Sequence, residues 1–437
     1  MKDVIPVYYG NIIVGSITPE PDITFTYSNE WLGRNPNFPV FPVSLSMPLS
    51  VHSYGHSTVT PWLMNLLPEG DPLAAAGRAL GVSTEDVIGM LSRIGQDVAG
   101  ALSVGRKRTT GKLGYRLIES DAELEKIINE LPRKPFLVGD EGVSMSLAGA
   151  QEKLPVTLSK GKLYIPINGA PSTHILKPDA QRLPGGVQNE AFCLTLAHQI
   201  GLDASEVTTG VAGKRSWCLV TRYDREIRDN KIYRLHQEDF CQALGFPPAL
   251  KYERGAGKRG VTINDMVNIT KDLGGDDTYR LLQGIIFNTL ITNGDAHAKN
   301  FSILLSGKSA PKLAPLYDLM CAAVWPHINK NMAQSIGNQK DGKHLMPKNW
   351  ERLAKVCNFN PRMVINLVGE MAEKVERGID KSLDAVRSMP AGDSYLLDGI
   401  KREISERCRS IKINIKPENT YVAGTELIDD SPTPTPS

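Results

Sequence analysis

A run of nine residues in the second half of the chain, NGDAHAKNF at positions 293–301, constrains the fold more than any other stretch. It holds Asp295 and Asn300 five positions apart, and a predicted hairpin made by FSILL and PKLAPLYDLM carries the chain on to Asp318. If these three side chains act together, the fold must bring the loop and the end of the hairpin to one place. If they do not, the run is a crowded polar turn and Asp318 is a common strand-end aspartate.

The spacing of these residues suits phosphoryl transfer. In that reaction one carboxylate meets the acceptor hydroxyl, while an amide oxygen on the same loop and a second carboxylate hold Mg²⁺ against the phosphates of ATP. The sequence therefore predicts Asp295 as the catalytic base, and Asn300 and Asp318 as the metal ligands. Lys299 is predicted to neutralise the charge that develops on the transferred phosphoryl group.

A lysine and a glutamate earlier in the chain are placed as a phosphate-binding ion pair would be. Lys177 ends the predicted strand THILK, and Glu190 lies at the start of the predicted helix QNEAFCLTLAHQIGL. An ion pair between them would hold the lysine toward the phosphates of ATP. Taken singly, Lys177 is better interpreted as a solvated lysine at a strand end, and Glu190 as a carboxylate that favours a helix N-terminus.

Two further segments flank this pair in the order that a kinase requires. The stretch SMSLAGAQEKLPV at 144–156 offers small residues and Lys153 for contact with phosphate oxygens, although a simple turn between strands is the plainer interpretation. The stretch LVTRYD, after the predicted helix, lies where a hinge would present backbone groups to adenine. The joint order of all the parts is what favours a kinase over a set of coincidences.

The predicted fold class is α+β, with a two-lobed, protein-kinase-like fold, a β-rich N-terminal subdomain and a helical C-terminal lobe. We expect strands followed by helices in an N-terminal subdomain at 1–135 and a kinase N-lobe at 136–225. A C-lobe at 226–415 should be mostly helical from HQEDFCQALG onward, and a proline-rich, disordered tail should occupy 416–437.

Composition narrows the class of protein. The chain has 50 Lys and Arg against 48 Asp and Glu, a net charge of +2, so no global charge directs it to nucleic acid or to a membrane surface. Its six cysteines form no CxxC pair, which argues against a zinc site or a disulfide framework. No secretion signal and no apolar run of membrane-spanning length is visible, so we expect a cytoplasmic protein.

Six motifs taken together resemble one known family. The stretches SLAGAQEK, THILKP, RYDR, HQEDFCQALG, DAHAKNFS and LAPLYD are similar, in this order, to the HipA toxins, the serine/threonine kinases of bacterial HipBA toxin–antitoxin modules. The resemblance implies ATP and Mg²⁺ as cofactors and a bacterial protein, glutamyl-tRNA synthetase, as the substrate whose phosphorylation arrests growth and promotes persistence. It also implies a partner, the dimeric helix-turn-helix antitoxin HipB, with which the toxin acts as corepressor on operator DNA.

The same resemblance assigns roles to single residues. It implies that Lys177 contacts the phosphates of ATP and that Ser146 is autophosphorylated, which would eject the phosphate loop and inactivate the kinase; Ser144 is a nearby alternative. The residues implied to surround the nucleotide are Ala148, Gly149, Ala150, Gln151, Glu152 and Lys153 in the phosphate loop, Thr221, Arg222 and Tyr223 in the hinge, and His297, Ala298, Lys299 and Asn300 in the catalytic loop.

Two other functions stay open. A small-molecule kinase could use the same two lobes and would turn over nucleotide with a metabolite. A catalytically silent corepressor would keep the fold but lack one of the four chemical side chains. Lys177, Asp295, Asn300 and Asp318 are all present, which counts against the second alternative.

Overall fold

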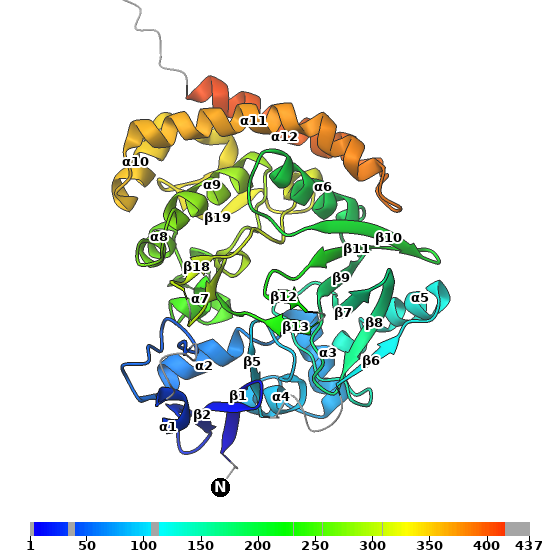
Figure 1. Ribbon diagram of the computed structural model, residues 1–437. Helices are drawn as coiled ribbons and strands as arrows, with labels where there is room; N and C mark the ends of the chain where they lie inside the picture. The colour runs from blue at the N-terminus through cyan, green and yellow to red at the C-terminus, as the bar shows by residue number, and fades with distance from the viewer. Residues whose placement is uncertain are drawn as a thin grey trace, which may run out of the picture.

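The computed structural model describes residues 4–33, 40–105, 113–229, 231–255, 257–307 and 309–415 (Figure 1). The predicted C-terminal tail at 416–437 lies outside these residues. Within the described part of the chain, no helix combines the length and the apolar character needed to cross a bilayer.

The N-terminal domain is an antiparallel sheet with helices packed beside it, at the bottom of Figure 1. Its strands lie in the order β4-β3-β2-β1-β5 and are β1 (Ile5–Tyr9), β2 (Ile12–Thr18), β3 (Thr24–Tyr27), β4 (Ser53–Tyr54) and β5 (Leu102–Val104). Its helices are α1 (Asn29–Leu32), α2 (His56–Met64), α3 (Gly70–Leu80) and α4 (Val87–Ile94). Phe25, Trp31 and Trp62 are almost wholly buried, and their large apolar area supplies much of this core.

The kinase N-lobe is a six-stranded antiparallel sheet in the order β10-β11-β9-β7-β8-β6. Its strands are β6 (Gly114–Leu117), β7 (Leu154–Ser159), β8 (Lys162–Ile167), β9 (His174–Pro178), β10 (Val207–Ala212) and β11 (Arg215–Thr221). The expected domain boundary near residue 135 needs correction, because β6 pairs with β8, and α5 (Asp121–Glu130) and the 3₁₀ turn η1 (Pro135–Leu137) share the apolar core of this sheet. The first domain therefore ends with β5.

Helix α6 (Gly186–Gln199) lies between the N-lobe sheet and the C-lobe, and packs on β10, α11 and α12. Because apolar neighbours surround it, residues on every face are buried, from Val187 to Ala197. A helix without a polar face is typical of such a central position. This placement brings Glu190, which lies just after the first turn of the helix, next to the sheet.

The C-lobe opens on a strand, whereas the sequence predicted mostly helix from residue 236. Strand β14 (His236–Asp239) pairs with β17, and Asp239 then caps α7 (Phe240–Ala243) in a reciprocal capping box with Gln242. The strands that follow are β15 (Arg254–Gly255), β16 (Lys258–Arg259), β17 (Ser302–Leu305), β18 (Lys312–Leu313), β19 (Asn331–Ile336) and β20 (Gln339–Asp341). Hairpin β12 (Arg225–Arg228) and β13 (Lys231–Arg234) precedes them.

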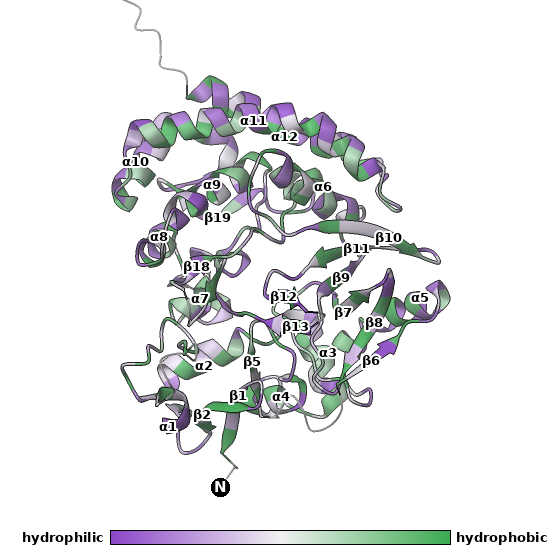
Figure 2. Cartoon of the chain, in the orientation of Figure 1, coloured by the Kyte–Doolittle hydropathy of each residue, from purple (hydrophilic) through white to green (hydrophobic). Residues whose placement is uncertain are grey.

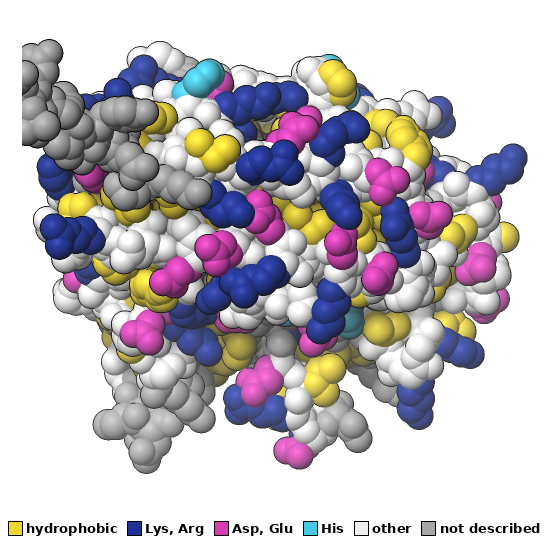
Figure 3. Space-filling view, turned by 90° about the horizontal axis from the view of Figure 1, so that it is seen from above, with side chains coloured by type: hydrophobic (Ala, Val, Ile, Leu, Met, Phe, Trp, Pro, Cys, Tyr) yellow, Lys and Arg dark blue, Asp and Glu magenta, His cyan; other side chains and the backbone are white. Residues whose placement is uncertain are grey.

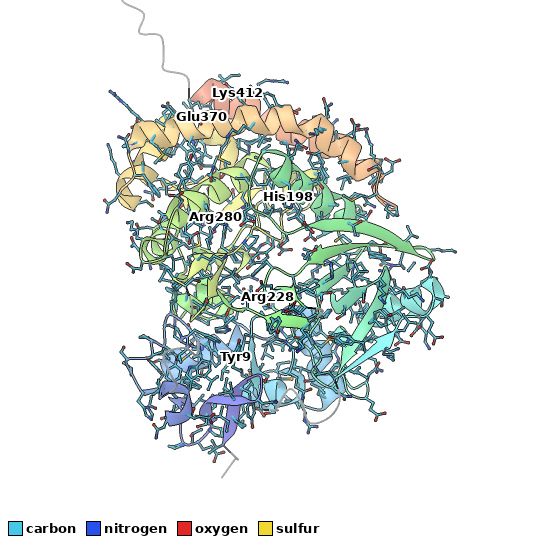
Figure 4. All side chains as sticks on the ribbon, in the orientation of Figure 1. Tyr9, His198, Arg228, Arg280, Glu370 and Lys412 are labelled. Atoms are coloured by element: carbon cyan, nitrogen blue, oxygen red, sulfur yellow. The ribbon has the colours of Figure 1, made fainter. Side chains whose placement is uncertain are left out.

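The rest of the C-lobe is helical, as predicted. Its α-helices are α8 (Ile263–Lys271), α9 (Asp277–Leu290), α10 (Pro347–Cys357), α11 (Pro361–Arg387) and α12 (Leu396–Asn414), and its 3₁₀ turns are η2 (Pro248–Leu250), η3 (Ala298–Asn300), η4 (Ala322–Val324) and η5 (Gly342–His344). Arg280 of α9, labelled in Figure 4, forms ion pairs with Asp203 at 2.5 Å and with Asp277 at 2.7 Å. These contacts tie α9 to the segment that follows α6.

Helices α11 and α12 form the outer layer of the C-lobe and carry green and purple residues along their lengths (Figure 2). Their apolar side chains, such as Leu367 and Ile404, are buried against the lobe. Seen from above, the outer face mixes basic and acidic side chains (Figure 3). Lys401 pairs with Asp380 at 2.5 Å across the two helices, so oppositely charged side chains alternate on this exposed surface.

A buried ionic junction joins the N-terminal domain to both lobes. Asp97, which lies between α4 and β5, is 1% exposed, and its Oδ1 is 2.9 Å from Arg225 and 2.9 Å from Arg234. Arg222 contacts Asp97 at 3.7 Å and Asp224 at 2.7 Å. The RYDR motif thus supplies charges that bind the first domain, and a buried charge of this kind persists only when it is paired and hydrogen-bonded.

Candidate active site

The Lys177 side chain stands at the centre of the site. It projects from β9, which lies between β7 and β11 in the N-lobe sheet. Its Nζ is 2.6 Å from Oε1 of Glu190 and 2.8 Å from Oδ1 of Asp318. Burial disfavours its charge, but the carboxylates of Asp318 and Glu190 outweigh burial and raise the pKa of Lys177 above its usual range. The ammonium therefore stays charged between two carboxylates that come from different lobes.

Helix α6 holds both sides of this arrangement through two consecutive residues. Glu190 binds the lysine, while Asn189 donates from Nδ2 to the carbonyl of Cys321 at 3.0 Å and accepts the N–H of Cys321 at 2.8 Å. Asn189 is fully buried, so these bonds replace the water that its amide has lost. The segment after Asp318 is thereby fixed relative to the lysine strand.

Asp318 itself lies in an irregular segment. The sequence predicted a strand up to this residue, but β18 ends at Leu313. Asp318 adopts a positive φ of 55°, a left-handed conformation that is uncommon outside glycine and asparagine. Burial would raise its pKa, but the ammonium groups of Lys177 and Lys153 outweigh burial and hold the pKa of Asp318 below its usual range. The carboxylate is therefore ionised and turned toward the lysine.

The catalytic loop is braced by its own amides. Asn300 donates from Nδ2 to the carbonyl of Asp295 at 2.9 Å, and Asp295 donates its N–H to Oδ1 of Asn293 at 3.2 Å. The 3₁₀ turn η3 (Ala298–Asn300) brings Asn300 back over the aspartate. Burial raises the pKa of Asp295. Because Nδ2 of Asn300 faces the loop, its Oδ1 is left for other contacts.

The structure gives Lys299 a different environment from the one expected. Its Nζ contacts Oδ2 of Asp239 at 2.8 Å and Oδ1 of Asn65 at 2.6 Å, and the side chain is 3% exposed. Asn65 follows α2, so the lysine is committed to the junction with the N-terminal domain. These partners correct the expectation that Lys299 faces the transferred phosphoryl group.

His297 is buried beside the same loop. Its ring meets the Tyr252 ring edge-on at a centroid distance of 5.2 Å, and among the described residues its Nδ1 has no hydrogen-bond partner. Burial, together with the nearby Lys251 ammonium, lowers the pKa of His297 to about 3. The imidazole is therefore neutral near pH 7, and its unpartnered nitrogen is a group that a nucleotide or a water molecule could satisfy.

Ser146 packs against the N-terminal domain. It is fully buried, its Oγ donates to the carbonyl of Leu66 at 2.8 Å, and its N–H donates to the carbonyl of Asp97 at 3.1 Å. Ser144 is also buried, and its Oγ donates to the carbonyl of Arg93 at 2.8 Å. Neither hydroxyl can meet a phosphoryl donor unless this segment moves.

The phosphate loop continues from Ser146 toward the lysine strand. The N–H of Glu69 donates to the carbonyl of Gly149 at 3.1 Å, and Nζ of Lys153 donates to the carbonyl of Ala148 at 2.6 Å. Burial and the Lys177 ammonium lower the pKa of Lys153 to about 8. The remaining loop residues are Ala150, which is exposed, and Gln151 and Glu152, which are half-buried.

The hinge leaves β11 at Thr221. The N–H of Thr221 donates to the carbonyl of Glu206 at 2.9 Å, and the N–H of Arg222 donates to the carbonyl of Thr173, also at 2.9 Å. These two amides are therefore engaged inside the protein. Tyr223, which is half-buried, is the next residue along the expected adenine-binding segment.

Several residues of the site escaped sequence reasoning. Asn189, Asn65, Glu69 and Tyr252 all contact predicted site residues or their neighbours. Asn189 could have been suspected from the sequence, because it directly precedes Glu190 on the predicted helix. The other three lie in segments whose sequence carries no catalytic pattern.

Comparison with known proteins identifies the family. The sequence model of the HipA-like C-terminal domain matches residues 145–379, and that of the HipA N-terminal domain matches residues 5–105. The chain belongs to the HipA family. The resemblance drawn from the six motifs is thereby confirmed, and the two matched ranges agree with the separation of β5 from the N-lobe sheet.

Individual HipA relatives match nearly the whole chain. The chain is 35% identical to the putative kinase Y4mE of Sinorhizobium fredii, over 94% of this chain and 99% of that protein. It is 24% identical to the serine/threonine-protein kinase toxin HipA of Shewanella oneidensis, over 92% of this chain and 94% of the relative. The solved complex of the Shewanella HipA with HipB and operator DNA contains a chain that matches with a TM-score of 0.79 and 24% identity, over 93% of this chain and 96% of that one. The predicted two-lobed, kinase-like fold is confirmed.

Proposed function

We propose that this protein is an ATP- and Mg²⁺-dependent protein serine/threonine kinase and the toxin of a HipBA-type module. One observation carries the proposal: Nζ of Lys177 contacts both Glu190 and Asp318, so the ion pair and the acidic residue that phosphoryl transfer requires are already assembled. Kinase names among the HipA relatives support the same activity.

The chain's own residues divide the chemistry between them. Asp295 accepts the proton of the acceptor hydroxyl, and Lys177 binds phosphate oxygens once nucleotide enters. The donor set for Mg²⁺ is the ionised carboxylate of Asp318 and the amide oxygen of Asn300, both hard oxygen ligands of the kind that Mg²⁺ prefers. The bound ion would neutralise charge on the phosphates. The phosphate loop at 148–153, the hinge at 221–223 and the neutral His297 are assigned to nucleotide contact, and Lys299 to the support of the catalytic loop.

The proposed modification site is Ser146. Its complete burial means that a phosphate cannot be held in the observed position, so phosphorylation would release the loop from Leu66 and Asp97. That consequence agrees with the inactivation implied by the family resemblance. The family resemblance also gives the proposed protein substrate, glutamyl-tRNA synthetase. Its phosphorylation in the cytoplasm is proposed to arrest growth and promote persistence.

A HipB-type helix-turn-helix antitoxin dimer and its operator DNA are the proposed partners. The solved Shewanella relative is a complex of HipA with HipB and operator DNA, which supports this assembly. The outer face of α11 and α12 mixes acidic and basic side chains, which favours DNA contact through the antitoxin over direct contact by this face (Figure 3).

Incubation of the full chain with γ-labelled ATP and Mg²⁺ tests the activity. We expect label on Ser146 in the wild type, no label in Asp295→Asn, and labelled glutamyl-tRNA synthetase when that protein is added. Wild-type protein that labels neither itself nor any protein of a bacterial lysate would remove the protein-kinase proposal. Label that appears only on a metabolite would indicate a small-molecule kinase instead.

A further inference from the structure

The hydroxyl of Tyr252 lies on the proposed catalytic base. It donates to Oδ1 of Asp295 at 2.5 Å, although the two residues come from different segments of the C-lobe. Burial, followed by the charge of Asp295, raises the pKa of Tyr252 above its usual range. The phenol therefore keeps its proton and acts as a hydrogen-bond donor at neutral pH.

The backbone on the N-terminal side of Tyr252 is fixed by the catalytic loop itself. The carbonyl of Lys251 accepts the N–H of Ala298 at 3.2 Å and the side-chain amide of Gln334 at 2.9 Å. The Lys251 ammonium lies 2.7 Å from the carboxylate of Glu69 in the N-terminal domain. The residue before the tyrosine is thus tied to three other segments.

The backbone on the C-terminal side is equally constrained. Glu253 donates its N–H to the carbonyl of Ala333 at 3.1 Å and accepts the N–H of Gly260 at 2.9 Å. A Cβ on Gly260 would lie 1.9 Å from the carbonyl oxygen of Tyr252, so only glycine allows this close approach. The backbone on both sides of Tyr252 is therefore held by hydrogen bonds to other segments, which fixes the point from which its side chain extends toward Asp295.

A fixed donor on one carboxylate oxygen has a specific chemical effect. With Oδ1 committed to the phenol, the carboxylate cannot rotate freely, and Oδ2 is the oxygen that meets an acceptor hydroxyl. The other charged groups that act on Asp295 are Asp318, Lys251 and Glu69, none of which donates to Oδ1 in this arrangement.

We propose that Tyr252 is a positioning residue for the kinase reaction, and that its hydroxyl holds the Asp295 carboxylate in the orientation that accepts the substrate proton. The inference rests on the proposed kinase function and adds a residue to it. It assigns no covalent step to the tyrosine. The rival interpretation is that the hydroxyl occupies the place of the acceptor and inhibits the enzyme.

Tyr252→Phe tests this assignment, because phenylalanine keeps the edge-on ring contact with His297 and removes only the hydroxyl. In the full-length protein we expect the rate of phosphate transfer at saturating ATP to fall about 10- to 100-fold, since small losses of alignment cost rates of this size. The dissociation constant for Mg·ATP and the unfolding temperature should stay close to those of the wild type. Tyr233→Phe, an exposed tyrosine on β13, is the matched control and should change none of these quantities.

A double variant separates positioning from a general structural role. If Tyr252 acts only through Asp295, Asp295→Asn with Tyr252→Phe should be no slower than Asp295→Asn alone. An unchanged rate in Tyr252→Phe, a faster rate, or an equal loss in nucleotide affinity would each overturn the assignment while leaving the kinase function intact. Wild-type protein without any transfer activity would overturn both.

Discussion

Nζ of Lys299 in the catalytic loop lies 2.6 Å from Oδ1 of Asn65 in the N-terminal domain. Asn65 also donates to the carbonyls of Pro61 at 2.8 Å and Phe246 at 2.9 Å, so one buried amide joins α2, the catalytic loop and the segment after α7. The proposed catalytic loop is therefore held by a domain that contributes none of the proposed catalytic, metal-binding or phosphate-binding side chains.

Removal of that amide should weaken both stability and activity. We expect Asn65→Ala to lower the free energy of unfolding by about 1–3 kcal/mol, because the buried Lys299 ammonium loses one of its partners and the carbonyls of Pro61 and Phe246 each lose a side-chain donor. The transfer rate should fall as well, since η3 loses part of its support. Urea unfolding and phosphate incorporation measure the two effects. Asn268→Ala, on the exposed face of α8, is the control and should change neither the free energy of unfolding nor the transfer rate. If the two variants behave alike, Asn65 does not support the catalytic loop.

The buried ion pair of the N-lobe predicts a second outcome. Glu190→Gln leaves Lys177 with Asp318 as its carboxylate partner among the residues that the structure describes. Loss of one partner of a buried pair typically costs about 3–5 kcal/mol. Glutamine still accepts a hydrogen bond, so the lower end of that range is expected. We also expect weaker Mg·ATP binding, because the lysine is drawn toward Asp318. Thermal unfolding and isothermal titration test these outcomes, and wild-type nucleotide affinity would show that the pair is dispensable for binding.

Asp318 allows charge to be tested separately from backbone strain. Asparagine tolerates the left-handed conformation better than alanine does, so Asp318→Asn removes the charge without forcing the backbone from its φ of 55°. We expect nucleotide affinity to lose its dependence on Mg²⁺ while the fold persists. Titration of ATP with and without Mg²⁺ decides the point. A variant that still binds ATP more tightly in Mg²⁺, as the wild type should, would show that the charge of Asp318 is not needed for the Mg²⁺ dependence.

Glu238 predicts a pH dependence of stability at the domain junction. Burial raises the pKa of this carboxyl to about 8, although its contacts with Ser44 at 2.5 Å and the N–H of Leu45 at 2.7 Å oppose the shift. The folded state therefore binds a proton that the unfolded state has lost, and stability falls as pH rises from about 5 to 8.

Substitution of that carboxyl provides the measurement. Glu238→Gln cannot ionise. Its amide oxygen can accept the N–H of Leu45 as the carboxylate does, and its amide N–H can donate to Oγ of Ser44, which in the wild type donates to the carboxylate. Relative to the wild type, we expect the variant to gain roughly 1–3 kcal/mol of unfolding free energy between pH 5 and pH 8. Urea unfolding at several pH values tests this. A difference between the two proteins that stays constant with pH would show that Glu238 does not titrate in that range.

The sequence could predict those parts of the site that depend on local spacing. Asp295 and Asn300 share one short loop, and Lys177 and Glu190 lie on adjacent elements, so their patterns are visible in the chain. Tyr252 could not be predicted, because its contact with Asp295 depends on a hairpin whose backbone bonds to β19 and to the catalytic loop.

In the fold, too, local patterns could be predicted and long-range contacts could not. Local patterns predicted β9 and α6. Strand β14 was missed, because its four residues are buried and polar and lead directly into the helix α7, so the stretch HQEDFCQALG was predicted as helix throughout. Lys299 was misplaced for a related reason. Its partner Asn65 lies 234 positions away in another domain, and no spacing rule reaches that far.

The carboxylate of Asp97 has a consequence for protein engineering. The Asp97 carboxylate of the N-terminal domain forms ion pairs with three arginines outside that domain, Arg222, Arg225 and Arg234. Without Asp97 these arginines lose an anionic partner, and without the arginines the buried Asp97 carboxylate loses three cationic partners. A chimera that grafts this first domain onto another kinase, or exchanges it for an unrelated one, must therefore restore an acid at the same point. We therefore expect the first domain to be exchangeable only together with the three arginines that bind it.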